Sequence, residues 1–126
     1  MIAALTPVIA IVAPAQAATI DWNGLAPLPY RAPPIVTAEM HQFVQRETIA
    51  RKCPLPEGAT GVSVDVAVLV DENGGIRVTV PRSVQCPTAE QYAAALVAGF
   101  ARNNLLPRMG AGEQWYRTTI TFAWAK

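Results

Sequence analysis

The clearest pattern in the chain is an alternation of valine with other, mostly polar or small, residues over residues 62–70. Every second position there is a valine, which is typical of a strand with one buried face. The alternation resumes over residues 76–80, after a short acidic and glycine-containing run. We therefore predict a β-hairpin whose valine side faces the core.

The register of this hairpin follows from the requirement that the apolar side chains share one face. We expect a three-residue loop, Glu72–Gly74, with Gly74 at the position that needs a positive φ. A two-residue Asn73-Gly74 turn would instead expose half of the pattern. The predicted cross-strand pairs are Val70 with Ile76, Val68 with Val78, and Val66 with Val80.

Two segments carry helix signals. Over residues 37–52, Thr37 can cap the start of a helix, and Arg51 and Lys52 suit its end. A second helix is predicted to begin at the capping box Thr88-Ala89-Glu90-Gln91 and to end before Pro107. Its apolar stripe should cover the valine face of the hairpin. The stripe consists of Ala89, Ala93, Leu96, Val97 and Phe100.

A last strand is predicted over residues 114–125, where apolar and polar side chains alternate. The predicted order is thus helix, strand, strand, helix, strand, and the fold class is α+β. A right-handed crossover places the last strand beside the first. The expected sheet is three-stranded and antiparallel, in the order second, first, last (2-1-3).

The N-terminus differs in character from this domain. Met1 to Ala18 contains no charged residue, and Ala15-Gln16-Ala17 resembles a signal-peptide cleavage site, so we expect a signal peptide over residues 1–17. An uncleaved membrane anchor is the alternative. Four prolines follow within residues 18–36, which predicts an extended tether before the domain at residues 37–126.

The two cysteines come before the first strand and before the second helix. An even number of cysteines in an exported chain favours a disulfide between Cys53 and Cys86. Two buried thiols are the alternative. A disulfide closing a loop of this length should contribute about 3–4 kcal/mol to stability.

Composition narrows the possible functions. The chain has 126 residues and a net charge of +1, which fits one small domain and argues against nucleic-acid binding. The single histidine, His41, has no nucleophile at a useful spacing and is interpreted as a polar-face residue. Two cysteines without C-x-x-C spacing and one histidine make a poor metal set. We therefore expect no enzymatic activity, no metal and no cofactor.

The hairpin run Val62–Val78, the helix end that leads to Leu105-Leu106-Pro107, and the aromatic last strand together resemble the C-terminal domain of TonB energy transducers. The resemblance covers residues 37–126 and is clearest over residues 61–125. It implies a periplasmic domain that pairs with a short extended segment of outer-membrane transporters. Members of this family pass on energy from an inner-membrane motor complex.

In this family the partner segment adds as a strand alongside the last strand of the sheet. That strand would be an edge without proline and with little charge, which suits strand addition. Pro81 blunts the opposite edge of the sheet. The alternative is that a helix or the N-terminal tail covers the edge of the last strand. The resemblance implies these partner-binding residues: Gln114, Trp115, Tyr116, Arg117, Thr118, Thr119, Ile120, Thr121 and Phe122.

Two departures from the family shape the functional prediction. Met1 to Ala18 lacks the polar, histidine-containing motif of motor-contacting members, and the tether is shorter than their proline-rich linkers. We therefore expect a free-standing periplasmic TonB-like interaction domain that binds an extended segment of an outer-membrane transporter or of another protein. An anchored energy transducer and a secreted structural or inhibitor-like domain are the alternatives, and membrane attachment is expected only if the N-terminal segment is uncleaved.

Overall fold

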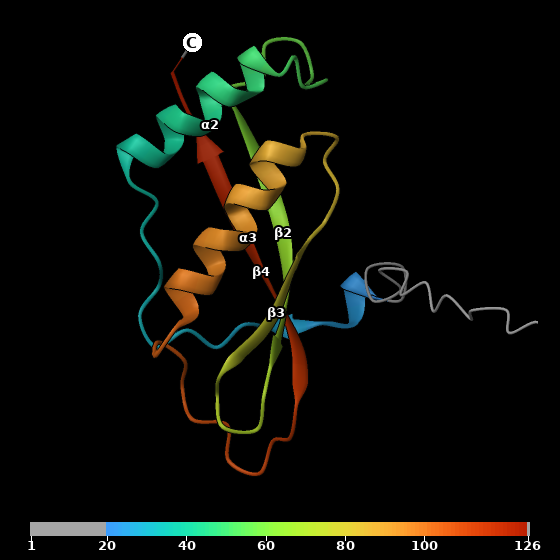
Figure 1. Ribbon diagram of the computed structural model, residues 1–126, viewed down its shortest axis with the longest axis vertical. Helices are drawn as coiled ribbons and strands as arrows, with labels where there is room; N and C mark the ends of the chain where they lie inside the picture. The colour runs from blue at the N-terminus through green and yellow to red at the C-terminus, as the bar shows by residue number, and fades with distance from the viewer. Residues whose placement is uncertain (1–19, 126) are drawn as a thin grey trace, which may run out of the picture.

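Two helices lie on one face of a four-stranded sheet in the computed structural model, which describes residues 20–125 (Figure 1). The strand order is β1-β4-β2-β3. The signal peptide or anchor predicted for residues 1–17 lies outside the described residues. The elements are η1 (Trp22–Gly24), β1 (Ala26–Pro27), α2 (Ala38–Ala50), β2 (Gly61–Val70), β3 (Ile76–Pro81), α3 (Pro87–Ala101) and β4 (Gln114–Ala123).

The predicted α+β class is confirmed, and the sheet has one strand more than expected. The order β3-β2-β4 matches the predicted second, first, last arrangement. The additional strand, β1, comes from the proline-rich segment and pairs with β4 in parallel, so the sheet is mixed and not purely antiparallel. Pro27 fits there because a proline is tolerated in an edge strand, where its missing N–H removes no bond from the sheet interior.

The core lies between the valine face of β2 and the two helices. Val64, Val66, Val68 and Val70 are fully buried, as the alternation predicts. The buried face of α3 meets them largely with small side chains, among them Ala89, Ala93 and Ala101, which lets the helix approach the sheet closely. From β4, the core receives Tyr116, Ile120 and Phe122.

The register of the hairpin is only partly as predicted. Val70 does lie opposite Ile76, but the next pair is Leu69 with Val78, so Arg77 is an extra residue in β3. This β-bulge moves the rest of β3 by one position, because side chains alternate with a period of two. The predicted pairs Val68–Val78 and Val66–Val80 are therefore wrong. The pairs beyond the bulge are Leu69–Val78, Val68–Thr79, Ala67–Val80 and Val66–Pro81.

The loop of the hairpin has the predicted length. The Asp71 N–H donates to the Gly75 carbonyl at 2.9 Å, which leaves the three residues Glu72–Gly74 between them. The Asp71 carboxylate accepts the N–H groups of Asn73 and Gly75 at 2.9 and 2.8 Å, which orders the turn. Gly74 has φ +85°, as expected.

We expect Gly74→Val to lower the free energy of unfolding by about 1–3 kcal/mol, measured by urea denaturation. An added Cβ at Gly74 meets no atom within 4 Å, so the loss comes from the left-handed backbone alone. Gly112→Val is the matched control, because that site is equally open but has no positive φ. An equal loss of stability in both variants would contradict this explanation.

The start of α2 is as predicted, and the start of α3 is not. Thr37 Oγ1 accepts the Met40 N–H at 3.3 Å, as a helix cap does. The capping box predicted at Thr88 is wrong, because α3 begins one residue earlier at Pro87. Proline suits the first helical position, where its missing N–H is not needed. Just before the helix, the Glu90 carboxylate accepts the backbone N–H groups of Val84 and Cys86 at 3.1 and 3.0 Å.

Candidate functional site

The outer edge of β4 is the site predicted from the sequence, and its backbone direction can be read from two hydrogen bonds. The Arg117 carbonyl accepts the Leu28 N–H at 2.8 Å, and the Ala123 N–H donates to His41 Nδ1 at 3.0 Å. Because alternate residues of a strand direct their backbone groups to opposite sides, Thr119 and Thr121 also direct theirs outward. These four residues define the outer side of β4.

The first part of this edge is covered by the N-terminal segment. β1 lies in parallel beside β4, with Ala26 opposite Tyr116 and Pro27 opposite Arg117. The pairing ends after Leu28, whose carbonyl accepts the Tyr30 N–H at 2.9 Å in a tight turn. The alternative that the N-terminal tail covers the edge is therefore correct for this part of β4.

The far end of the edge is covered by α2. His41 is half-buried, and its ring meets Phe122 edge-on with 6.4 Å between ring centroids. Because Nδ1 accepts the Ala123 N–H, the neutral ring carries its proton on Nε2. The sequence interpretation of His41 as a polar-face residue missed this role, since no local signal links a helix residue to a strand 82 positions away.

Between these covers lies an open gap in the edge, which we call the β4 gap and define by Thr119 and Thr121. Both residues are exposed. Within residues 20–125, their outward backbone groups make no hydrogen bond. The gap thus presents two donors and two acceptors to solvent on an otherwise occupied edge.

Side chains beside the β4 gap form a polar ladder on the open face of the sheet. Thr119 Oγ1 donates to Asp65 Oδ1 at 2.6 Å, and the hydroxyls of Thr121 and Ser63 lie 2.9 Å apart. Asp65 also forms an ion pair with Arg82 at 3.5 Å. The residues of the β4 gap are therefore held by cross-strand bonds on one face and by the buried Ile120 between them on the other.

Trp22 secures the N-terminal segment against the open face of the sheet. Its carbonyl accepts from Arg117 of β4 at 3.2 Å, and its ring lies 5.5 Å from the Arg82 guanidinium beyond β3. Trp22 therefore reaches across β2 near Ala67, which is fully buried although it faces away from the helices. Such cation–π contacts contribute about 0.5–1 kcal/mol at exposed sites.

After β1, the chain is held by the end of α3. The Asn104 side-chain amide donates to the Ala32 carbonyl at 2.8 Å and accepts the Ala32 N–H at 3.0 Å. It thus bonds to both backbone groups of Ala32, as a neighbouring strand would. Tyr30 is paired with Leu105 and accepts a hydrogen bond from Thr118 Oγ1 at 3.4 Å. Burial raises the pKa of the Tyr30 phenol, and the bond with Thr118 acts in the opposite direction. The segment predicted to be a tether is thus docked from Trp22 onward.

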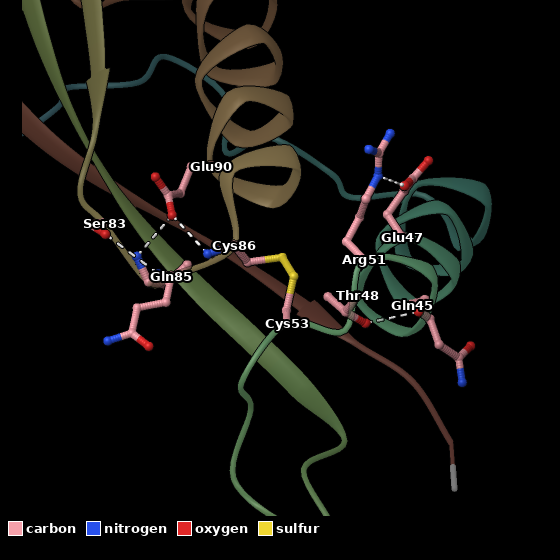
Figure 2. The surroundings of a disulfide bond; sticks show 10 residues. Gln45, Glu47, Thr48, Arg51, Cys53, Ser83, Gln85, Cys86 and Glu90 are labelled. Carbon is pink, nitrogen blue, oxygen red and sulfur yellow. Dashed lines mark hydrogen bonds and ion pairs between the residues drawn. A yellow bond between two sulfur atoms is a disulfide. The ribbon is translucent and has the colours of Figure 1, made fainter.

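The predicted disulfide is present and joins the two helical parts of the fold (Figure 2). Cys53 follows α2, and the fully buried Cys86 precedes α3, with 5.3 Å between their Cα atoms. Figure 2 shows Glu90 accepting the backbone N–H of Cys86 next to the sulfur bridge. The alternative of two buried thiols is wrong.

Six of the nine residues predicted to bind a partner fall into three groups. Tyr116, Ile120 and Phe122 are buried in the core, so a partner can reach only their edge-facing neighbours. Arg117 is engaged by the N-terminal segment. Thr119 and Thr121 alone combine exposed side chains with free outward backbone groups.

Neither a metal-binding cluster nor a membrane-spanning helix is seen in the described part of the chain. Residues 20–125 contain no group of three side chains placed to hold a metal ion. No helix within this range has both the length and the apolar character needed to cross a membrane. Comparison with known protein families, curated proteins and solved structures finds no match for the chain.

Proposed function

We propose that this chain is a periplasmic, TonB-like interaction domain that binds a short extended segment of an outer-membrane transporter by strand addition at the β4 gap. This proposal rests on one observation: the outward N–H and C=O groups of Thr119 and Thr121 have no hydrogen-bond partner within residues 20–125. An unpaired strand edge is a template for another strand, and main-chain hydrogen bonds supply the affinity of such complexes. The resemblance of residues 61–125 to TonB C-terminal domains supplies the class of partner.

The length of the β4 gap limits the partner. In a parallel addition like that of β1, the partner residue opposite Ile120 would bond to the Thr119 carbonyl and the Thr121 N–H. A segment longer than about three residues would meet β1 on one side and His41 on the other. A short segment fits without rearrangement, and a longer one has to displace β1.

Photo-crosslinking in cells tests the partner directly. A photo-reactive amino acid placed at Thr119 is expected to give adducts with outer-membrane transporters, identified by mass spectrometry. The matched control is the same amino acid at Gln91, an exposed position on α3. Adducts only with unrelated proteins, or the same adducts from both positions, would contradict the proposal.

A proline variant tests the backbone mechanism. Thr121→Pro removes the outward N–H without removing a bond to β2, so the fold should be retained. We expect the yield of adducts from Thr119 to fall about three- to tenfold, as for the loss of one hydrogen bond. Thr121→Val keeps the N–H and removes only the hydroxyl bonded to Ser63. Equal adduct yields from the two variants would show that the N–H is not used.

A further inference from the structure

Two adjacent hollows lie where the β2–β3 hairpin faces the C-terminal end of α3. The first has a volume of about 230 Å³ and is bounded by Thr79 on β3 and Ala98 and Arg102 on α3. The second, of about 370 Å³, extends toward Leu105. Both are lined by Gly74 and Asn103, so they adjoin and are treated together as one depression. We call this depression the hairpin trough.

One wall of the hairpin trough is the outer edge of β3. The Arg82 N–H donates to the Asp65 carbonyl of β2 at 2.8 Å. Because backbone groups of successive residues point to opposite sides of a strand, the N–H and C=O of Thr79 point away from β2. Pro81 has the same outward direction, which explains why a residue without an N–H is tolerated there. Within residues 20–125, the Thr79 backbone makes no hydrogen bond on this outer side. Thr79 therefore offers one donor and one acceptor to the trough.

The opposite wall is the small-residue side of α3. Ala98 contributes only a methyl group to the lining. The helix thus leaves room beside the strand edge, and an extended chain needs about 4.7–4.9 Å from a neighbouring strand.

The charges around the hairpin trough are mostly positive. Four arginines line it, and Glu72 is the single acidic residue in the lining. Arg77 is balanced by an ion pair with Glu113 at 3.0 Å, and Arg108 bonds to the Tyr116 hydroxyl and to backbone carbonyls. Arg102 is exposed and forms no ion pair or hydrogen bond with any residue in the range 20–125. The remaining lining arginine is Arg31, which donates to the Leu105 carbonyl.

We propose that the hairpin trough binds an acidic extended peptide, which pairs with the Thr79 backbone and places a carboxylate at Arg102. The strand edge and the small helix face accept an extended main chain, and the excess of arginines selects acidic side chains. This site lies on the opposite edge of the sheet from the β4 gap and does not depend on the function proposed there.

The peptide Glu-Val-Glu-Val-Glu-Val-amide, labelled with fluorescein at its N-terminal amine, serves as the probe in fluorescence anisotropy. We expect saturable binding that weakens as salt is added, because the charges are exposed and screened. The same peptide with lysine in place of glutamate should not bind. In NMR spectra, the largest amide shifts should occur at Thr79 and Arg102.

Two variants test the residues of the trough. Arg102→Glu should raise the Kd of the acidic peptide about tenfold, as for reversal of one exposed charge. Ala98→Leu should block binding by filling the space beside the strand. Arg46→Glu is the matched control, since Arg46 is an exposed arginine on α2 and should leave the Kd unchanged.

Several outcomes would overturn this proposal. These are no saturable binding up to about 1 mM peptide, equal binding of the lysine peptide, or an unchanged Kd in Arg102→Glu. Amide shifts at Thr119 and Thr121 in place of Thr79 would assign the peptide to the β4 gap. Amide shifts at Arg102 without any at Thr79 would indicate a simple anion site. An NMR spectrum of each variant confirms that the fold is retained.

Discussion

Phe122→Ala is expected to lower the free energy of unfolding by about 3–5 kcal/mol, the largest effect of any substitution considered. Phe122 is fully buried, and its ring contacts both Tyr92 of α3 and His41 of α2. Truncation would leave a cavity at the point where both helices meet β4. Since a small domain has about 5–15 kcal/mol of stability in total, this one substitution should remove a large share of it.

Urea denaturation followed by tryptophan fluorescence measures this effect. Thr121→Ala is the matched control, because Thr121 is the preceding residue and faces the open side of the sheet. It loses one exposed hydroxyl contact with Ser63 and should change stability by less than about 1 kcal/mol. Similar losses in the two variants would mean that Phe122 is not packed as described.

Removal of the disulfide is expected to have the next largest effect. Replacing Cys53 and Cys86 together by alanine should lower the free energy of unfolding by about 3–4 kcal/mol, because the bond closes a loop across a sequence separation of 33. The bond also holds the end of α2 near the start of α3, and both helices supply core residues. Urea denaturation of the oxidised wild type and of the double variant gives the difference.

Reduction of the wild type provides the control for that experiment. The reduced protein should unfold at a similar urea concentration to the double alanine variant, since both lack the covalent link and the variant lacks in addition only the two sulfur atoms. The intact mass of the oxidised protein should be lower by two hydrogen atoms. An oxidised protein no more stable than the reduced one would contradict a stabilising role for the bond.

The elements that could be predicted from the sequence are those with strong local patterns. The valines of β2 alternate along the strand, and the helices cover the side on which they lie, so these residues are buried. Thr37 precedes α2, and its hydroxyl caps the helix by accepting a backbone N–H of the first turn, an interaction that depends only on neighbouring residues. The pairing of Val70 with Ile76 also follows from local pattern and turn chemistry.

The bulge at Arg77 could not be predicted from the same pattern. The facing rule assumes that valine marks one side of β3, whereas Val78 and Val80 lie beside Leu69 and Ala67 on the other side. That side is partly covered where Trp22 crosses the sheet. A strand that is shielded on both faces can carry valine on either, so its side-chain pattern does not define the register.

The cover over β4 was missed for a different reason. β1 has only two residues, one of them a proline, and it pairs with a strand about 90 positions later. No periodicity marks such a segment. The available signal was composition, because Trp22 and Tyr30 are large aromatic residues in a stretch interpreted as an exposed tether. Aromatic side chains of that size gain from burial, which favours docking of the segment on the domain.

The parallel pairing of β1 with β4 has a consequence for the order in which the chain folds. Among the described elements, the partner of β1 follows all the others in the chain, so the segment around Trp22 has no docking surface until β4 has been synthesised. Contacts this distant in sequence close late, after the local hairpin and helices have formed. We therefore expect the segment around Trp22 to remain unpaired until β4 has formed, and to close over the sheet as a late step of folding.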